Sequence, residues 1–371
     1  MRKILAALIF IAALSGTSWA NVLYTTDNGK LGIIGVQGVL SIDAPAVQYD
    51  GIGNNAFVAS FWNGDESRVI VLDRATGDTT SWDKVFIFKS SSLSEPLKGS
   101  GNFLEGIRST QAAVSAVSGG GLFIASRENA SIVQLDTDNL KYVRSYAYKT
   151  ESGDSTPHMQ GVLVNYRYIY GLLEAGEAKS VFFRFDGQLK EKVAGTFKVG
   201  FPQEAASMTW LSGSRIAAAV SSGVGLLGSD GFYSLVSTDQ PAKSLCPDNG
   251  DGFYFTTQTE EDGAYTSTLY HYSSDETTEI CSEQGKGCQL LGIGNGMLAA
   301  VLGEKILICD SSNGATLEEF DSDTLGGVPV YACVRYISGE KSDSSNGSCT
   351  LSGAGIFMLL AFAGIAVKCR K

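Results

Sequence analysis

Histidine is almost absent from this chain, which has only His158 and His271 among its 371 residues. The G-x-S-x-G, Walker-type, H-E-x-x-H and C-x-x-C motifs are missing as well. Their absence argues against the serine-hydrolase, nucleotide-hydrolysing, zinc-protease and dithiol sites that they mark. His158 follows Asp154 and Ser155 in a turn-like run, so it is a candidate general base that Asp154 or another acid would orient. His271 is expected on the surface of a sheet, and we assign no catalytic or cofactor-binding residue.

Basic residues are also scarce, since 28 Lys and Arg face 39 Asp and Glu and the net charge is −11. Nucleic acids and anionic lipid surfaces both reward Lys and Arg, so neither is expected as a partner. An acidic chain is compatible with a basic partner or with bound cations. The runs Asp248-Asn-Gly-Asp-Gly252 and Asp321-Ser-Asp323 resemble calcium loops, but the first has glycines where oxygen ligands are needed. Both are expected to be turns, with loosely bound Ca²⁺ as the open alternative.

Cysteine is limited to seven residues, five of them between residues 21 and 341. Cysteines in an oxidising compartment can pair. Cys281 and Cys288 flank a short polar loop and are the best candidates for a disulfide. The alternative is that all five fill buried strand positions as free thiols. An odd number leaves at least one thiol unpaired within the chain. The five residues are Cys246, Cys281, Cys288, Cys309 and Cys333.

Proline is scarce too, with 7 residues against 44 glycines. Together with frequent Val, Tyr, Phe and Thr, this composition predicts an all-β chain of short strands joined by glycine turns. A group of three strands recurs along the chain, most clearly at 121–126, 131–136 and 141–146. The second strands of successive groups end at residues 73, 136, 186, 229, 274 and 310. Their spacing centres near the about 40–45 residues of a propeller blade.

A strand rich in small residues precedes each group, which suits the crowded inner position of a radial sheet. These inner strands are predicted at 46–49, 112–117, 159–164, 206–211, 242–246 and 288–293. The two ends then complete each other, because residues 22–26, 30–36 and 39–42 lack an inner strand and residues 328–336 lack a following group. Joining them closes a ring and removes exposed edges. We therefore predict a β-propeller of seven four-stranded blades over residues 21–341.

Several turns carry the pattern of a known family. Val-Ile-Val-Leu-Asp-Arg-Ala-Thr-Gly at residues 69–77 and Ile-Leu-Ile-Cys-Asp-Ser-Ser-Asn-Gly at residues 306–314 resemble the turns of YVTN-type and quinoprotein-like (PQQ-like) propellers. The resemblance implies that Asp73 and Asp310 stabilise their turns and that Gly77 and Gly314 adopt left-handed conformations. Trp82 lies one residue later than that family's docking tryptophan. The resemblance concerns architecture, and it does not support quinone binding.

The N-terminus has the pattern of a secretory signal. Arg2 and Lys3 precede the apolar run 4–14, and Ser18 and Ala20 satisfy the small-x-small rule. Residues 1–20 are therefore predicted to be a signal peptide, cleaved between Ala20 and Asn21.

The C-terminus has the pattern of an envelope anchor. A polar stalk (342–350) leads to an apolar segment (351–367) that is near the minimum length for crossing a bilayer, and the chain ends in Lys368-Cys-Arg370-Lys371. Basic residues stay on the cytoplasmic side. A GPI signal would end in apolar residues instead, and an ordinary single-span anchor is the simplest interpretation.

The tail also resembles the bacterial GlyGly-CTERM and Synerg-CTERM sorting domains, through its Ser-Asn-Gly-Ser-Cys run followed by a Gly/Ala/Leu-rich segment and a basic end. The resemblance implies that a membrane protease cuts near Cys349 and releases the protein to the cell surface. Ser348 stands where those tails carry a glycine.

These features favour an exported, envelope-anchored propeller that binds a protein, a glycan or a small ligand without catalysis. A hydrolase or lyase acting at the mouth of the central channel is the first alternative, and a structural envelope protein is the second. Clustered Asp, His and Arg at that mouth would favour the enzyme, and a broad aromatic and polar patch would favour the binding module.

Overall fold

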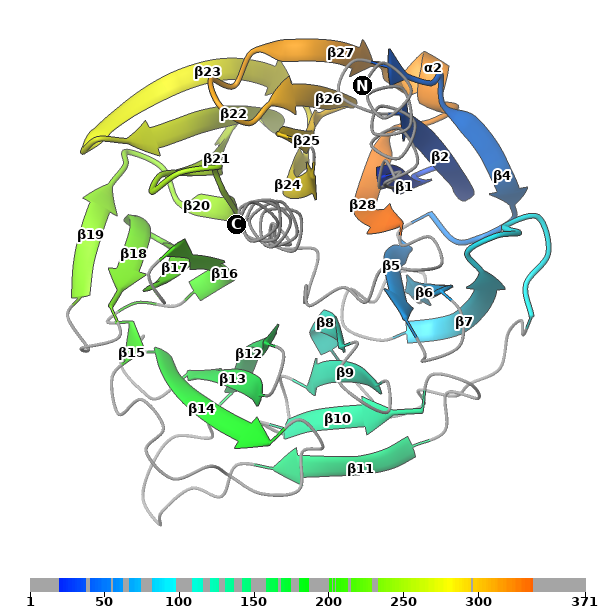
Figure 1. The fold of residues 1–371 in the computed structure, drawn as a ribbon, viewed down its shortest axis with the longest axis horizontal. Coiled ribbons are helices and arrows are strands. Elements are labelled where there is room, and N and C mark those ends of the chain that lie inside the picture. Colours follow the sequence, from blue (N-terminus) through cyan, green and yellow to red (C-terminus); the bar gives the residue numbers. More distant parts are fainter. Residues whose placement is uncertain are drawn as a thin grey trace, which may run out of the picture.

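The computed structural model describes residues 20–37, 41–54, 56–62, 67–74, 82–97, 109–115, 121–126, 131–136, 142–147, 158–165, 168–174, 180–186, 200–201, 203, 205–212, 215–228, 233–294 and 296–335. Within these residues, strands form seven antiparallel sheets that succeed one another around a central axis (Figure 1). The predicted all-β propeller architecture is confirmed. The expected signal and tail segments lie outside the described residues. No helix in the described part of the chain is long and apolar enough to cross a membrane.

Five sheets have four strands each, running from an inner strand beside the axis to an outer edge (Figure 1). The strands of the first such sheet are, from inside outward, β8 (Ser109–Ser115), β9 (Gly121–Ser126), β10 (Ser131–Leu135) and β11 (Tyr142–Ala147). Those of the second are β12 (His158–Asn165), β13 (Tyr168–Glu174), β14 (Ser180–Asp186) and β15 (Gly200–Phe201). The predicted third strand at 192–197 lies outside the described residues, and β15 supplies the outer edge instead.

The other three four-stranded sheets follow the same order. They are β16 (Ala205–Leu211), β17 (Arg215–Val220), β18 (Gly223–Leu227) and β19 (Tyr233–Ser237); β20 (Ala242–Pro247), β21 (Phe253–Glu261), β22 (Ala264–Ser273) and β23 (Glu276–Gln284); and β24 (Gly287–Gly294), β25 (Met297–Gly303), β26 (Lys305–Asp310) and β27 (Thr316–Phe320). The predicted inner strands at 206–211, 242–246 and 288–293 are confirmed as β16, β20 and β24.

The seventh sheet joins the two ends of the ring. β28 (Pro329–Arg335) is its inner strand and pairs with β1 (Ala20–Thr26), which pairs with β2 (Lys30–Gln37). Asn21 lies opposite Arg335, and Thr25 lies opposite Tyr331. The predicted closure of the ring by its ends is therefore confirmed, and Figure 1 shows the first and last strands side by side.

One predicted inner strand is wrong. Residues 46–49 belong to β4 (Ala46–Asp50), which pairs with β2 on the outer part of the closing sheet. β3 (Ser41–Ile42) covers only Val36 and Gln37 of β2, so the rest of that edge would keep unpaired backbone groups without β4. The next sheet therefore has three described strands, β5 (Phe57–Trp62), β6 (Ser67–Arg74) and β7 (Trp82–Lys89), with β5 innermost.

The core lies between neighbouring sheets, and the sheets whose side chains are described have buried residues on both faces. Successive residues of one strand enter different cores: Val22 and Tyr24 pack against β24–β26, whereas Leu23 packs against β5–β7. β25 behaves in the same way and is buried throughout. Burial on both faces explains why these strands read as continuous apolar runs rather than as an alternation of apolar and polar residues.

The ring has two faces that differ in what they carry. The first, here called the network face, holds the loop 248–252, Gly296 and the turn 311–315, and the Ser311 N–H donates to the Gly296 carbonyl at 2.8 Å. In a four-stranded sheet the inner strand is followed outward by three antiparallel strands, so the chain is back at its starting face when the next inner strand begins. The inner strands therefore run in the same direction around the ring. Arg335 and Asn21, the ends of the ring, therefore also lie at the network face.

The opposite face, here called the closure face, holds the turn 27–29 and the connection 321–328. That connection contains the short helix α2 (Ser322–Leu325), capped at its N-terminus by Asp321. The Asp27 N–H donates to the Val328 carbonyl at 2.9 Å, and the Val328 N–H donates to Asp27 Oδ1 at 2.8 Å. The Tyr24 hydroxyl donates to the Leu325 carbonyl at 3.4 Å. These bonds fasten the seam where the two ends of the ring meet.

Candidate functional site

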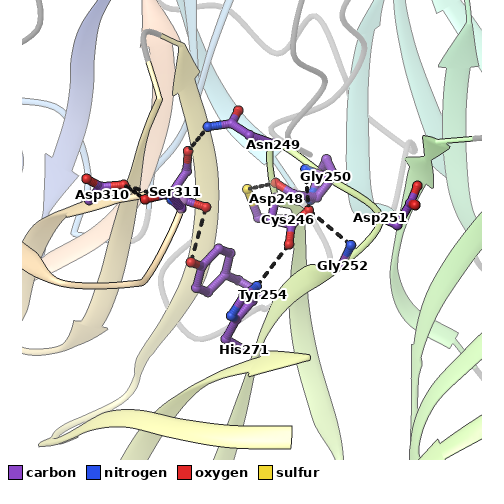
Figure 2. A network of polar contacts seen from close by, with 12 residues as sticks. Cys246, Asp248, Asn249, Gly250, Asp251, Gly252, Tyr254, His271, Asp310 and Ser311 are labelled. Carbon is purple, nitrogen blue, oxygen red and sulfur yellow. Dashed lines mark hydrogen bonds and ion pairs between the residues drawn. The ribbon is translucent and has the colours of Figure 1, made fainter. Parts of the chain in front are cut away.

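The most elaborate polar cluster among the described residues is built around Asp248, in the loop after β20 (Figure 2). Its Oδ1 accepts the backbone N–H groups of Gly250 at 2.7 Å and Gly252 at 3.0 Å. A side chain at Gly252 would overlap the Tyr272 carbonyl oxygen. The Asp-Asn-Gly-Asp-Gly run is therefore a turn held by its first aspartate, as the sequence predicts.

His271 contacts the second carboxylate oxygen of Asp248. Its Nε2 lies 2.9 Å from Asp248 Oδ2, and the two side chains are only 15% and 11% exposed. The imidazole stacks on the ring of Tyr254, which is its partner in the β21–β22 pairing, with ring centroids 4.3 Å apart. The prediction that His271 lies on a sheet surface is wrong, because this face of the sheet is covered by the next blade.

Tyr254 links this pair to the following blade. Its hydroxyl donates to the Ser311 carbonyl at 3.2 Å. Burial raises the pKa of Tyr254 well above its ordinary value, and the charge of Asp248 raises it further. The phenol therefore remains a neutral hydrogen-bond donor at any physiological pH.

The same loop contacts both neighbouring blades. On one side, Ser212 Oγ donates to Asp251 Oδ1 at 2.7 Å and the Arg215 guanidinium donates to the Asp251 carbonyl at 3.2 Å. On the other side, the Asn249 amide donates to Ser311 Oγ. We call Asp248, Asn249, Asp251, Tyr254, His271 and Ser311, with Ser212 and Arg215, the loop network. It ties three successive blades together at the network face.

The acidic runs offer no cluster of cation ligands among the described residues. Asp310 Oδ1 accepts from the Ser312 N–H at 2.8 Å and from its hydroxyl at 2.6 Å. Asp321 Oδ1 accepts from the same two groups of Thr324 at 2.8 and 2.6 Å. In each case the hydroxyl bond, followed by the backbone bond, lowers the pKa of the aspartate. No described group of three or more His, Cys, Asp or Glu could hold a metal.

The turn predicted at residues 310–314 is confirmed. Asp310 accepts from its own turn, and Gly314 has φ 74°. Gly77, its counterpart in the turn after Asp73, lies outside the described residues. Gly294 and Gly296 also have positive φ and join β24 to β25, as expected of a turn.

The predicted disulfide between Cys281 and Cys288 is not formed in this structure. Cys281 is on the outer strand β23 and Cys288 is on the inner strand β24 of the next sheet, so the connection between them crosses the ring from outside to inside. Cys309 and Cys333 are buried free thiols. Burial raises the pKa of Cys281 to about 11 and that of Cys309 to about 12, so neither thiol is a reactive thiolate near neutral pH.

Other predicted site residues are only partly placed. His158 begins the inner strand β12 opposite Glu174, whereas Asp154 lies outside the described residues. Ala20 and Asn21 begin β1, and the signal segment before them is outside that part of the chain. Cys349, Lys368, Arg370 and Lys371 also lie outside it. These predictions remain predictions.

Sequence reasoning missed Tyr254, Asn249, Ser311, Ser212 and Arg215. Their bonds join residues 36 to 62 positions apart in neighbouring blades. Only the register of the blades brings them together, so no local motif marks them. Only for Tyr254 could the sequence have predicted a contact. Aligning the two strands of the hairpin from the turn at 262–263 places Tyr254 opposite His271.

No protein-family model matches this sequence, and no curated protein is similar to it in sequence. Solved structures do share its fold. A protein described as a candidate 6-phosphogluconolactonase from Bacteroides fragilis aligns with a TM-score of 0.60 at 13% identity, over 86% of this chain and 99% of its own. The periplasmic gluconolactonase of Pseudomonas aeruginosa aligns with a TM-score of 0.53 at 12% identity, over 86% and 99%. A Lactobacillus plantarum protein aligns with a TM-score of 0.51 at 10% identity, over 85% and 99%. At these identities the likeness establishes the β-propeller fold.

Proposed function

We propose that this chain is an exported propeller, anchored to the cell envelope by its tail, that acts as a non-enzymatic binding module. The observation that carries the proposal is the way in which the loop network uses its polar groups. Asp248 and His271 bind each other, and Asp251 and Asn249 bind the two neighbouring blades. The groups that could perform acid–base chemistry there instead hold the loops in place.

A face whose loops are fastened in this way is preorganised. Binding then costs little loop ordering, and reduced ordering is a main source of affinity for a rigid scaffold. The ring adds to this rigidity, because the closing sheet joins the two ends of the chain. The export and anchoring part of the proposal is supported by the sequence patterns at residues 1–20 and 342–371.

Affinity capture with the full-length chain, solubilised in detergent, tests the proposal. Envelope extract of the producing cells would be passed over the immobilised protein and over two variants, Asn313→Arg on the network face and Asp262→Arg on the closure face. Both residues are exposed, so neither change disturbs the core. We expect a saturable ligand that is retained by the native chain and lost in one variant only. Equal capture by all three proteins would contradict binding on a face of the ring.

A hydrolase is the competing proposal, because Asp248 and His271 form an Asp–His pair at the network face. Two structures of similar fold bear lactonase names, so δ-gluconolactone is the first substrate to assay. If the pair is structural, the native chain and the His271→Phe variant will both leave the lactone at its spontaneous rate of hydrolysis. Turnover by the native chain that disappears in His271→Phe, with the fold retained by circular dichroism, would favour the enzyme.

A further inference from the structure

The position of the last strand determines at which face of the ring the tail begins. Arg335 is the last described residue of the inner strand β28, and it lies opposite Asn21 at the network face. We propose that the anchored protein turns its network face towards the bilayer and presents its closure face to the outside. This inference rests on the anchoring part of the proposed function.

The length of the tether limits how the ring can sit on the membrane. Residues 336–350 separate β28 from the apolar segment 351–367, and 15 residues reach at most about 50 Å when fully extended. A domain of about 320 residues has a radius of gyration near 20 Å, which corresponds to a sphere of about 25 Å radius.

These lengths do not allow the ring to invert. The tether leaves close to the axis, because β28 is an inner strand (Figure 1). For the closure face to rest on the membrane, the tether would have to pass from the pole of the ring over the rim and then down to the bilayer beside it. For a sphere of about 25 Å radius that path is a quarter of the circumference plus one radius, about 65 Å, which exceeds the reach of the tether. The ring can tilt, but its closure face cannot rest on the membrane.

Charge acts in the same direction. The closure face is the more acidic of the two among the described residues, because its exposed Lys243 and Lys286 are outnumbered by exposed carboxylates that include Asp27, Asp239, Glu261, Asp262, Glu304 and Asp323. The exposed charges of the network face include Asp43, Asp251, Asp275, Glu276 and Lys89. Like charges repel within a Debye length of about 10 Å, so an anionic bilayer disfavours close approach of the closure face more strongly.

The orientation assigns roles to the two faces. A folded macromolecule arriving from solution meets the closure face, with the β21–β22 hairpin at its surface. The network face is turned towards the bilayer, at a distance that cannot exceed the reach of the tether, at most about 50 Å.

Energy transfer to a labelled bilayer tests the orientation. Ala315 and Ala264 are exposed alanines on the network and closure faces respectively, Ala315 in a turn and Ala264 at the start of β22, so they form a matched pair. Each would be replaced in turn by p-azidophenylalanine in the full-length chain and coupled to a donor fluorophore. The labelled protein would be inserted from detergent into preformed liposomes that carry an acceptor on their lipid headgroups.

We expect higher transfer efficiency from position 315 than from position 264. Insertion of a 30-residue Gly/Ser linker after Ser345 should shrink this difference, because the longer tether can pass over the rim. Equal efficiencies with the native tether, or a higher efficiency at position 264, would overturn the orientation. If the protein fails to float with the liposomes in a density gradient, the anchor itself is wrong and the orientation falls with it. Flotation with equal efficiencies rejects the orientation alone.

Discussion

At the scale of single residues, the polar side chains of the network face work mainly within the protein. Asp248 is the extreme case, since its two oxygens accept from two backbone N–H groups and contact His271. All of these groups belong to one blade, whereas Asp251 and Asn249 reach the neighbours. Asp248 therefore shapes the loop, and the other two fix its position.

Replacing Asp248 tests this division of labour. Asp248→Ala should lower the free energy of unfolding by about 2 kcal/mol, because it leaves partly buried donors without their acceptor. Asp251→Ala at an exposed position should cost less than about 1 kcal/mol. Urea denaturation of both variants measures the difference. Equal losses would show that Asp248 is no more important than a surface residue.

Tyr24 should make the free energy of unfolding depend on pH in the alkaline range. Burial raises its pKa from 10.0 to about 12, so the folded state holds this proton more tightly than the unfolded state does. The corresponding stability is complete below about pH 10 and is lost as pH rises from there towards 12. Tyr24→Phe should therefore show a shallower decline of the free energy of unfolding over that range. Identical slopes for the two proteins, measured by denaturant titration at several pH values, would refute this assignment.

Residue-level predictions from the sequence succeeded where the chemistry is local. The Asp310–Gly314 turn is stabilised within five consecutive residues, so its composition was sufficient to predict it. The role of His271 could not be predicted in this way, because Asp248 lies 23 positions away and the burial of the pair comes from the neighbouring blade. Local patterns carry no information about such contacts.

At the scale of elements, composition located most strands but did not always assign them to a sheet. The sequence predicts a strand at 46–49 and places it on the inside of a blade, whereas in the structure β4 covers the outer edge of β2. Its residues Ala46, Val47 and Asp50 are exposed, which a crowded inner position would not allow. Small residues predict tight packing only when burial is already known.

Inner strands also bond to one another across the gap between blades. Gln289 on β24 donates its amide to the Ala332 carbonyl at 3.0 Å and accepts the Ala332 N–H at 2.9 Å. This clamp satisfies backbone groups of β28 on the side that faces β24. Leu290 makes a similar link by donating its N–H to Ser244 Oγ at 3.0 Å. The clamp thus fixes β28, the inner strand of the closing sheet, against the neighbouring blade.

Removing the clamp should weaken the contact between β24 and β28. Gln289→Ala should lower the free energy of unfolding by about 1–3 kcal/mol, because a donor and an acceptor of β28 lose their partner together. The matched control is Gln284→Ala, whose amide makes one exposed bond to Thr266 at 3.0 Å and should cost less than about 0.5 kcal/mol. Thermal denaturation compares the two. A larger effect at residue 284 would contradict the clamp.

At the scale of the whole molecule, the closing sheet governs cooperativity. A chain shortened after Asp323 loses β28, which exposes β1 and removes Ala332 and Cys333 from two cores. It should lose much of the roughly 5–15 kcal/mol typical of folded domains. A chain ending at Lys341 keeps β28 and is the control. Calorimetry that shows the same melting temperature and sharpness for both would refute closure as a source of stability.

The closing sheet also sets the order in which the chain can mature. Asn21 can pair with Arg335, its neighbour in the finished sheet, only after the more than 300 residues between them have been made. Until β28 has been synthesised and delivered, the inner edge of β1 stays open and can pair with the wrong strand of its own or another chain. Contacts this distant in sequence form slowly. An export route that delivers the chain unfolded would postpone folding until both halves of the seam are in the same compartment.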